Sequence, residues 1–85
     1  MDEDARDFYE NEEIVEAVKR FKKMIKNDSF EYFDVFEIEG MTDYFLDEGK
    51  IKLARMAVAN GLDIHPASTV LQIKKAQILL VEGKA

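Results

Sequence analysis

The sequence predicts an all-α protein built from antiparallel helical hairpins, with about four helices. Apolar residues make up 47% and charged residues 35% of the 85 residues, a balance typical of soluble helical proteins. Only one proline and four glycines interrupt the chain. Apolar side chains recur at helical spacing in four segments, and each segment is followed by a turn or stop signal. A chain of this length hides only about 60–65% of its unfolded surface, so we expect a thin core.

The first expected helix runs from residue 11 to about residue 26. Acidic residues occupy its first turns and lysines its last turns, as the helix dipole favours. The sequence Asn-Asp-Ser at 27–29 then breaks the helix. Its apolar residues fall on one face at spacings of four, three and four: Ile14, Val18, Phe21 and Ile25. We interpret residues 11–28 as an N-terminal capping helix, or as the second helix of an earlier hairpin, preceded by an acidic tail at 1–10.

The second expected helix runs from Val35 to Glu48. Asp34 can cap its start, and Glu37 stands where a capping box requires it. The end is marked by Gly49. Its apolar stripe is Ile38, Met41 and Phe45. A glycine at position 40 should cost about 1 kcal/mol of helix stability relative to alanine.

Two further helices should follow. In the segment from Ile51 to Pro66, small residues recur on one face that lets another helix approach closely: Ala54, Ala57, Val58 and Gly61. The proline stops this helix. Because a short Gly-Lys turn joins it to the helix before, the two should pack antiparallel as a hairpin within 33–68. The fourth helix, Thr69 to Glu82, has apolar positions at Leu71, Ile73, Ala76, Leu79 and Leu80.

A 34-residue repetition links the second and fourth helices. The sequence DEGK at 47–50 is nearly repeated as VEGK at 81–84, and the same offset sets Phe45 on Leu79 and Glu48 on Glu82. A fixed offset of this size is typical of repeat proteins. The chain resembles the tetratricopeptide repeat family over residues 35–85, with first-copy matches at Ile38, Met41, Thr42, Phe45, Gly49, Ala54, Val58, Gly61 and Pro66, and second-copy matches at Ala76, Leu79 and Gly83. Within this pattern Ala54 and Ala76 are the small residues expected where paired helices cross. The chain departs from that family at Gln72 and Lys75, and it has no tryptophan.

The resemblance implies an α-solenoid, a right-handed stack of helices, that serves as a non-catalytic scaffold for a peptide or helix of a partner protein. Residues 69–85 would be the first helix of a second repeat. The family's ligand groove, carried onto this sequence, consists of Phe36, Glu39, Asp43, Asp47, Ile73, Lys74, Gln77 and Leu80. Acidic residues stand where the best-known groove of the family has lysines and asparagines, so we expect a neutral or basic ligand. Alternatively, the three acidic residues form a solvated helix face.

The apolar face of helix 69–82 has nothing after it to cover it, which suggests the N-terminal part of a longer array. The alternative is a homodimer through this helix, with Leu71 and Leu79 as an exposed self-association face. In that case the protein is a small self-associating structural domain with no external ligand.

Several classes of function are disfavoured. The chain has no cysteine and a single histidine, His65, which we place at a surface turn without partners for a metal or a catalytic base. No phosphate-binding loop or nucleophile motif is present. We therefore expect neither an enzyme nor a cofactor or metal site. The net charge of −6 and the lack of any long apolar run disfavour nucleic acid and membranes, and we expect a cytoplasmic protein.

Two clusters have alternative interpretations. Lysines at 19, 22, 23 and 26 share a helix face that could contact phosphate, although lysines are ordinary at a helix C-terminus. The aromatic residues Phe30, Tyr32, Phe33 and Phe36 could form a patch for a partner. We favour the alternative that they pack the first helix onto the hairpin, because a thin core needs its largest side chains.

Overall fold

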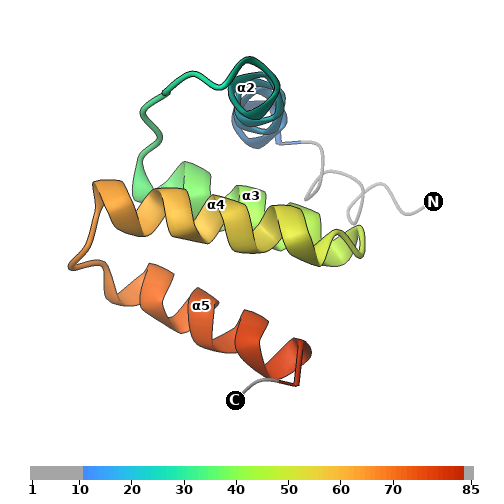
Figure 1. Cartoon of the computed structure of the whole chain (residues 1–85), viewed down its shortest axis with the longest axis vertical. Coiled ribbons are helices and arrows are strands. Elements are labelled where there is room, and N and C mark those ends of the chain that lie inside the picture. The colour runs from blue at the N-terminus through green and yellow to red at the C-terminus, as the bar shows by residue number, and fades with distance from the viewer. Residues whose placement is uncertain (1–10, 84–85) are drawn as a thin grey trace.

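The computed structural model describes residues 11–83, and in that range it contains four α-helices and no strand. The helices are α2 (Glu12–Asn27), α3 (Val35–Asp47), α4 (Ile51–Ile64) and α5 (Thr69–Val81) (Figure 1). The predicted all-α class is therefore confirmed. The predicted acidic tail at 1–10 and residues 84–85 lie outside the described residues. Among residues 11–83, no helix is long and apolar enough to cross a membrane.

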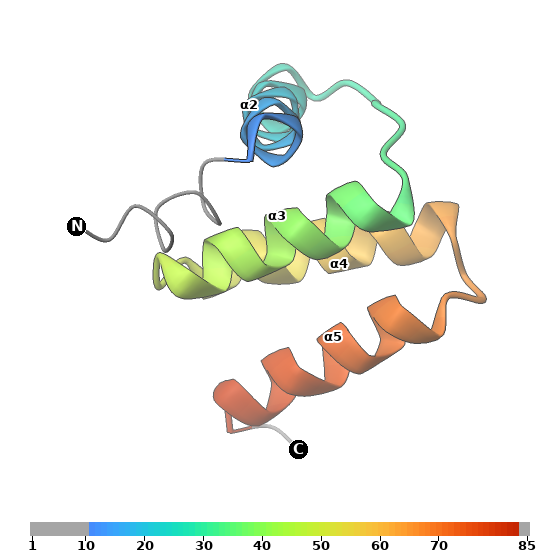
Figure 2. The same ribbon diagram turned by 180° about the vertical axis from the view of Figure 1, so that it is seen from behind.

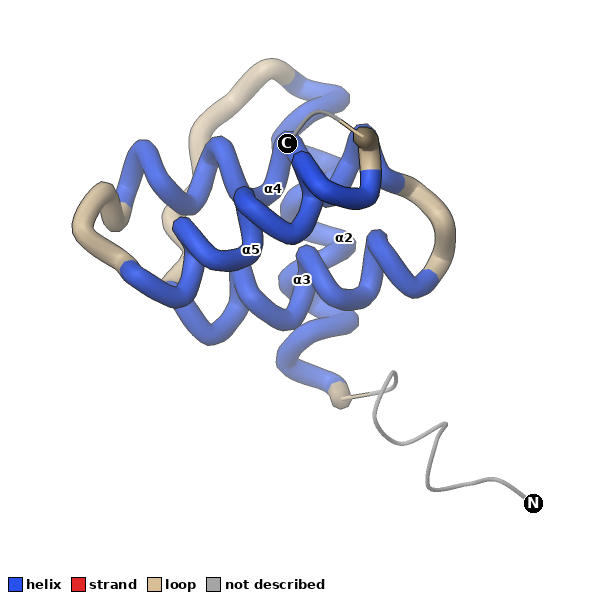
Figure 3. The backbone as a smooth tube through the Cα atoms, turned by 90° about the horizontal axis from the view of Figure 1, so that it is seen from below, coloured by secondary structure: helices blue, strands red, loops and turns tan. Residues whose placement is uncertain are grey.

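The hairpin of α3 and α4 forms the middle layer of the molecule. The two helices lie side by side, with α2 on one side of them and α5 on the other (Figures 1 and 2). In both views α2 is seen nearly end-on while α3 and α4 run across the picture, so α2 crosses the hairpin instead of running alongside it. In Figure 3 α5 lies in front of the hairpin, and it contacts both α3 and α4.

Local capping explains where the helices begin and end. The Asn11 side chain accepts hydrogen bonds from the backbone N–H groups of Glu13 and Ile14, and α2 ends at Asp28 in the left-handed conformation, with φ of 53°. The predicted capping box of α3 is present: Asp34 accepts from the Glu37 N–H at 2.7 Å, and the Glu37 carboxylate accepts from the Asp34 N–H at 3.1 Å. The predicted ends of α3 and α5 are each one residue too long, because Glu48 and Glu82 are C-caps.

The interface between α3 and α4 is symmetric about the Gly49–Lys50 turn. Residues equally distant from this turn are buried on both helices, which is the pattern that antiparallel pairing produces. The pairs are Phe45 with Ala54, Thr42 with Ala57, Met41 with Val58, and Ile38 with Gly61. At the last pair a Cβ on Gly61 would lie 2.7 Å from Ile38 Cγ2. The predicted small-residue face of α4 thus allows the close approach of α3.

Aromatic side chains and a glycine join α2 to the hairpin. The ring of Phe21 packs against the rings of Phe33 and Phe45, each at 6.0 Å between centroids, and all three are buried. A Cβ on Gly40 would lie 2.2 Å from Ile14 Cδ1, so the glycine predicted to weaken α3 instead makes room for α2. Of the aromatic cluster, Phe33 alone is buried; Phe30, Tyr32 and Phe36 are 72%, 57% and 53% exposed.

The orientation of α5 corrects two expectations about its faces. Leu71, expected on an exposed self-association face, is fully buried: a Cβ built on Gly61 of α4 would lie 2.9 Å from its Cδ1. Ala76, expected at a crossing of paired helices, is exposed. Both differences arise because Leu71 and Ile78 form the side of α5 that packs on the hairpin, and Ala76 points elsewhere.

Candidate functional site

Helix α5 carries four of the seven large apolar side chains that are exposed among the described residues. Four of its large apolar side chains are exposed to 40–64%: Val70, Ile73, Leu80 and Val81. By contrast, only Leu71 and Ile78 of this helix are buried. Their spacing along the helix places these four residues on one side of it, and exposed apolar surface of this kind is typical of a site that binds other molecules. Helix α5 contributes to two different surfaces of the molecule.

The first face combines α3 and α5 and contains the eight residues predicted as partner-binding. We name it the α3/α5 face. On α3, Phe36 and Asp47 are exposed, and Glu39 and Asp43 are partly buried. On α5, Ile73, Gln77 and Leu80 are exposed, and the side chain of Lys74 is only 14% exposed.

One ion pair connects the two helices of this face. Lys74 Nζ lies 2.5 Å from Asp43 Oδ1, so the structure brings these two predicted residues into direct contact. Because the lysine balances this aspartate, the acidic character of the face depends chiefly on Glu39 and Asp47. The pair also fixes α5 relative to α3, since a mostly buried charge is costly without its partner.

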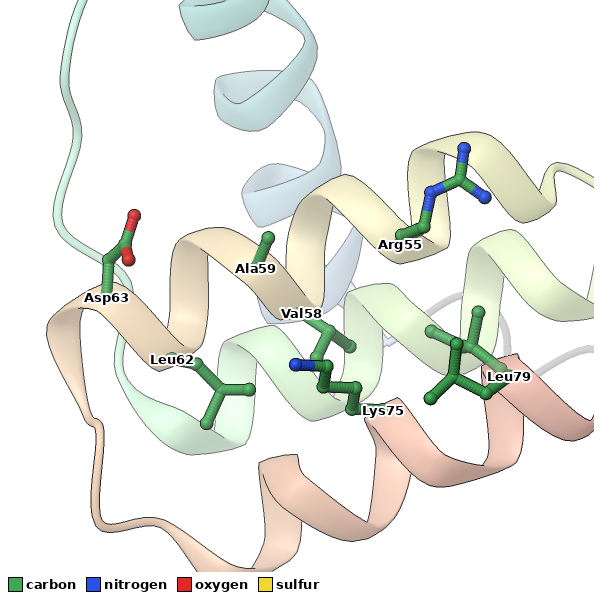
Figure 4. A pocket seen from close by; sticks show the side chains of 8 residues that line it. Arg55, Val58, Ala59, Leu62, Asp63, Lys75 and Leu79 are labelled. Carbon is green, nitrogen blue, oxygen red and sulfur yellow. The ribbon is translucent and has the colours of Figure 1, made fainter. Parts of the chain in front are cut away.

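The second face is a pocket between α4 and α5, which we name the α4/α5 pocket. Its volume is about 250 Å³. Apolar side chains form most of its wall: Val58, Ala59 and Leu62 from α4, and Ile78 and Leu79 from α5 (Figure 4). Charged residues complete the lining: Arg55 and Asp63 from α4, and Lys75 from α5.

Of the pocket residues only Leu79 was a predicted site residue. The others were missed because a pocket between two helices depends on how they pack, which the periodicity of either helix does not determine. The signal that could have found them is the 34-residue offset, which places Lys75 and Leu79 at the positions of Met41 and Phe45, two fully buried residues of α3.

Charged groups at one end of the α4/α5 pocket are already paired. The Arg55 guanidinium forms an ion pair with the Glu82 carboxylate, whose side chain is 13% exposed. This pair connects α4 to the C-cap of α5. Lys75 lies one helical turn before Leu79 on the exposed side of α5.

Two of the remaining predicted features, His65 and Lys19, have structural partners. His65 is partly buried; its Nε2 lies 2.9 Å from the carbonyl oxygen of Phe33, and its ring packs edge-on against Tyr32. Lys19 pairs with Glu16 at 3.9 Å on the surface. Lysines 22, 23 and 26 are exposed.

One group of carboxylates, from Glu13, Asp34 and Glu37, has oxygens within 4.8 Å of one another. Two of these three groups have other roles. Asp34 caps α3, and Glu37 both completes the capping box and pairs with Arg20 at 3.4 Å. This arrangement explains the cluster as part of the junction between α2 and α3.

Comparisons with protein-family models, curated proteins and solved structures find no match for this chain. Its function is therefore inferred from its own residues.

Proposed function

We propose that this protein is a non-catalytic interaction module whose α3/α5 face binds an extended or helical segment of a partner protein. The observation that carries the proposal is the exposed apolar surface of α5, where Ile73 and Leu80 are 53% and 64% exposed. Large apolar side chains in such a patch are stabilised by contact with a partner. The tetratricopeptide-like architecture is part of the proposal, and the 34-residue repetition supports it.

Charge selects the class of segment. Glu39 and Asp47 lie on the α3 side of the face, and the chain as a whole carries a net charge of −6. Acidic segments are repelled, and neutral or basic ones are favoured both in the complex and during diffusional encounter. The ligand is therefore an apolar segment with lysine or arginine residues near its contact positions.

A random dodecapeptide library displayed on phage tests this proposal. Panning against the folded protein should enrich peptides that combine apolar residues with lysine or arginine and contain few acidic residues. We expect Ile73→Asp to weaken a selected peptide at least about tenfold, because it places a charge in the apolar contact. Fluorescence anisotropy with the labelled peptide measures the change.

The matched control is Phe30→Asp, which removes another exposed apolar side chain outside the α3/α5 face. This control should leave the affinity unchanged. Circular dichroism verifies that both variants remain folded. Enrichment of acidic peptides, or equal affinity of the Ile73→Asp variant and the wild-type protein, would contradict the proposal.

A further inference from the structure

Helices α3 and α5 are followed by turns with the same backbone conformation. Glu48 and Glu82 have φ, ψ of −85°, 0° and −83°, −2°, and Gly49 and Gly83 have φ of 76° and 74°. Each glycine N–H donates to a carbonyl three residues earlier at 3.0 Å, Leu46 in one case and Leu80 in the other. The 34-residue repetition of the sequence is therefore also a repetition of conformation.

One face of each helix packs on the element that precedes it. In α3 this face includes Glu37, which pairs with Arg20 of α2, and Gly40, which contacts Ile14 of α2. The offset carries Glu37 to Leu71 and Gly40 to Lys74. Leu71 is buried against α4, and Lys74 pairs with Asp43 of α3. This face of α5 is therefore occupied, as it is in α3.

The second face is occupied in α3 and open in α5. The buried stripe of α3 consists of Ile38, Met41, Thr42 and Phe45. Ile38 lies against Gly61 of α4, and at the other end of the stripe Phe45 also packs on Phe21 of α2. The offset carries it to Gln72, Lys75, Ala76 and Leu79, which we name the open stripe. Gln72, Lys75 and Ala76 are exposed, and Leu79 is partly buried. Two members of the open stripe, Lys75 and Leu79, line the α4/α5 pocket.

We propose that the open stripe and the α4/α5 pocket together form a seat for an amphipathic helix of a partner protein. The helix runs antiparallel to α5, in the relation that α4 has to α3. It contacts the open stripe on one side and the α4 wall of the pocket, Ala59 and Leu62, on the other. This seat is separate from the α3/α5 face, so it is a second interaction surface and does not depend on the first.

The chemistry of the occupant follows from the antiparallel pairing seen in the hairpin. Met41 of α3 and Val58 of α4 are equally distant from the Gly49–Lys50 turn, and both are buried. The offset puts Lys75 at the position of Met41, so the partner helix meets a lysine at the position that corresponds to Val58. When the partner helix packs over Lys75, it removes the ammonium group from water, which is costly unless a negative charge lies beside it. This position of the partner helix is therefore glutamate or aspartate. The acidic residue also distinguishes the seat from the α3/α5 face, which favours basic segments.

The other contact positions follow in the same way. The position over Leu79 takes a larger apolar residue than the Ala54 that covers Phe45, because leucine is smaller than phenylalanine. The next position, over Ala76, is small, and the last, over Gln72, is polar. On the partner helix we count from the apolar residue over Leu79. The small residue then comes three positions later, the acidic residue four positions later and the polar residue seven positions later. This spacing places all four on one helix face.

A stapled helical peptide of about 15 residues tests the seat, because short unconstrained helices are marginal in water. It carries leucine, alanine, glutamate and glutamine at the four contact positions. In an NMR titration of the ¹⁵N-labelled protein, we expect saturable shifts at Ala59, Leu62 and Leu79. The peptide should leave the amides of Phe36 and Glu39 unchanged.

A charge reversal supplies the specific test. Lys75→Glu should weaken the peptide about fivefold, and the same peptide with lysine in place of glutamate should recover that loss on the variant. Lys52→Glu, an equal charge change at an exposed position of α4 outside the pocket, should have little effect. Ala76→Gln should also weaken binding, since it adds bulk in the middle of the open stripe. Circular dichroism verifies the fold of each variant.

Several results would overturn the proposal. These are the absence of saturable shifts, shifts confined to the α3/α5 face, or equal affinity of both peptides for the Lys75→Glu variant. A concentration-dependent dimer of the chain alone that Ala76→Gln dissociates would show that a second copy fills the seat. That result would also contradict the proposal that a helix of another protein binds there.

Discussion

At the residue scale, two phenylalanines three positions apart have opposite environments. Phe33 is fully buried beside Phe21, with the Arg20 guanidinium carbon 4.5 Å from its ring centroid, whereas Phe30 is 72% exposed. We expect Phe33→Ala to lower the free energy of unfolding by about 3–5 kcal/mol, a large share of the roughly 4–12 kcal/mol typical for a chain of this length.

The matched variant Phe30→Ala should change the free energy of unfolding by less than about 0.5 kcal/mol. Urea denaturation followed by circular dichroism measures both. Equal losses for the two variants would show that Phe33 does not join α2 to the hairpin.

Gly40 provides a second prediction at this scale. Alanine is a better helix former than glycine by about 1 kcal/mol, yet its Cβ would meet Ile14 Cδ1 at 2.2 Å. We expect overpacking, which costs about 1–3 kcal/mol, to outweigh the gain and leave Gly40→Ala less stable than the wild-type protein.

Combining Gly40→Ala with Ile14→Val, which removes the clashing methyl group, should reduce the cost of the alanine. Thermal and urea unfolding of the two single variants and the double variant give the coupling between the positions. A stabilising Gly40→Ala in the wild-type background would contradict the close packing of α2 on α3.

The individual residues of α5 show what the sequence could not decide. Apolar side chains surround this helix, since Leu71, Ile73, Leu79 and Leu80 do not share one face. Periodicity therefore identified a helix without identifying the side that packs on the hairpin. Burial of Leu71 and exposure of Ala76 depend on contacts with Gly61 and Asp43, which lie far away in the sequence.

At the scale of elements, the capping box of α3 is a local device with a measurable effect. The Asp34 carboxylate accepts from the Glu37 N–H at 2.7 Å. We expect Asp34→Ala to cost about 1 kcal/mol of stability, because it leaves a helix N-terminal donor without its partner. Asp34→Asn keeps an acceptor oxygen and should retain most of the stability. A similar loss in both variants would indicate that the charge, and not the cap, matters.

Element limits were predictable because caps and breakers act within a few residues. Asp34 and Ser68 cap α3 and α5 through hydrogen bonds to residues three positions later. The orientation of α2 was not predictable in the same way. It depends on the contact of Ile14 with Gly40 and of Phe21 with Phe33, and these pairs bring together separate segments of the chain.

At the scale of the whole molecule, exposed apolar residues on α5 raise the question of self-association. The face first expected to pair two copies included Leu71, which is buried. We have proposed that both surfaces of α5 bind segments of other proteins. On that basis we expect a monomer of 9.8 kDa across a dilution series in light scattering. A mass that doubles with concentration, and returns to the monomer value in Leu80→Asp, would favour the self-associating alternative.

Of the two proposed surfaces, only the α3/α5 face could be predicted from the sequence. The α3/α5 face was predicted from a family resemblance, and the Asp43–Lys74 contact shows that its two helices are adjacent. The α4/α5 pocket arises from the packing of α5 on α4, so no single segment carries its pattern. Only the comparison of α5 with α3 residue by residue shows that Lys75 and Leu79 correspond to Met41 and Phe45, which are fully buried in α3.

The most direct test is an NMR titration of the ¹⁵N-labelled protein with both probes, the phage-selected basic peptide and the stapled acidic helix, added in either order. If α5 presents two separate surfaces, the first probe should shift the amides of Ile73 and Gln77 and the second those of Ala59 and Leu62. Both should remain bound together without competition. Displacement of one probe by the other, or shifts at the same residues, would contradict the existence of two surfaces on α5.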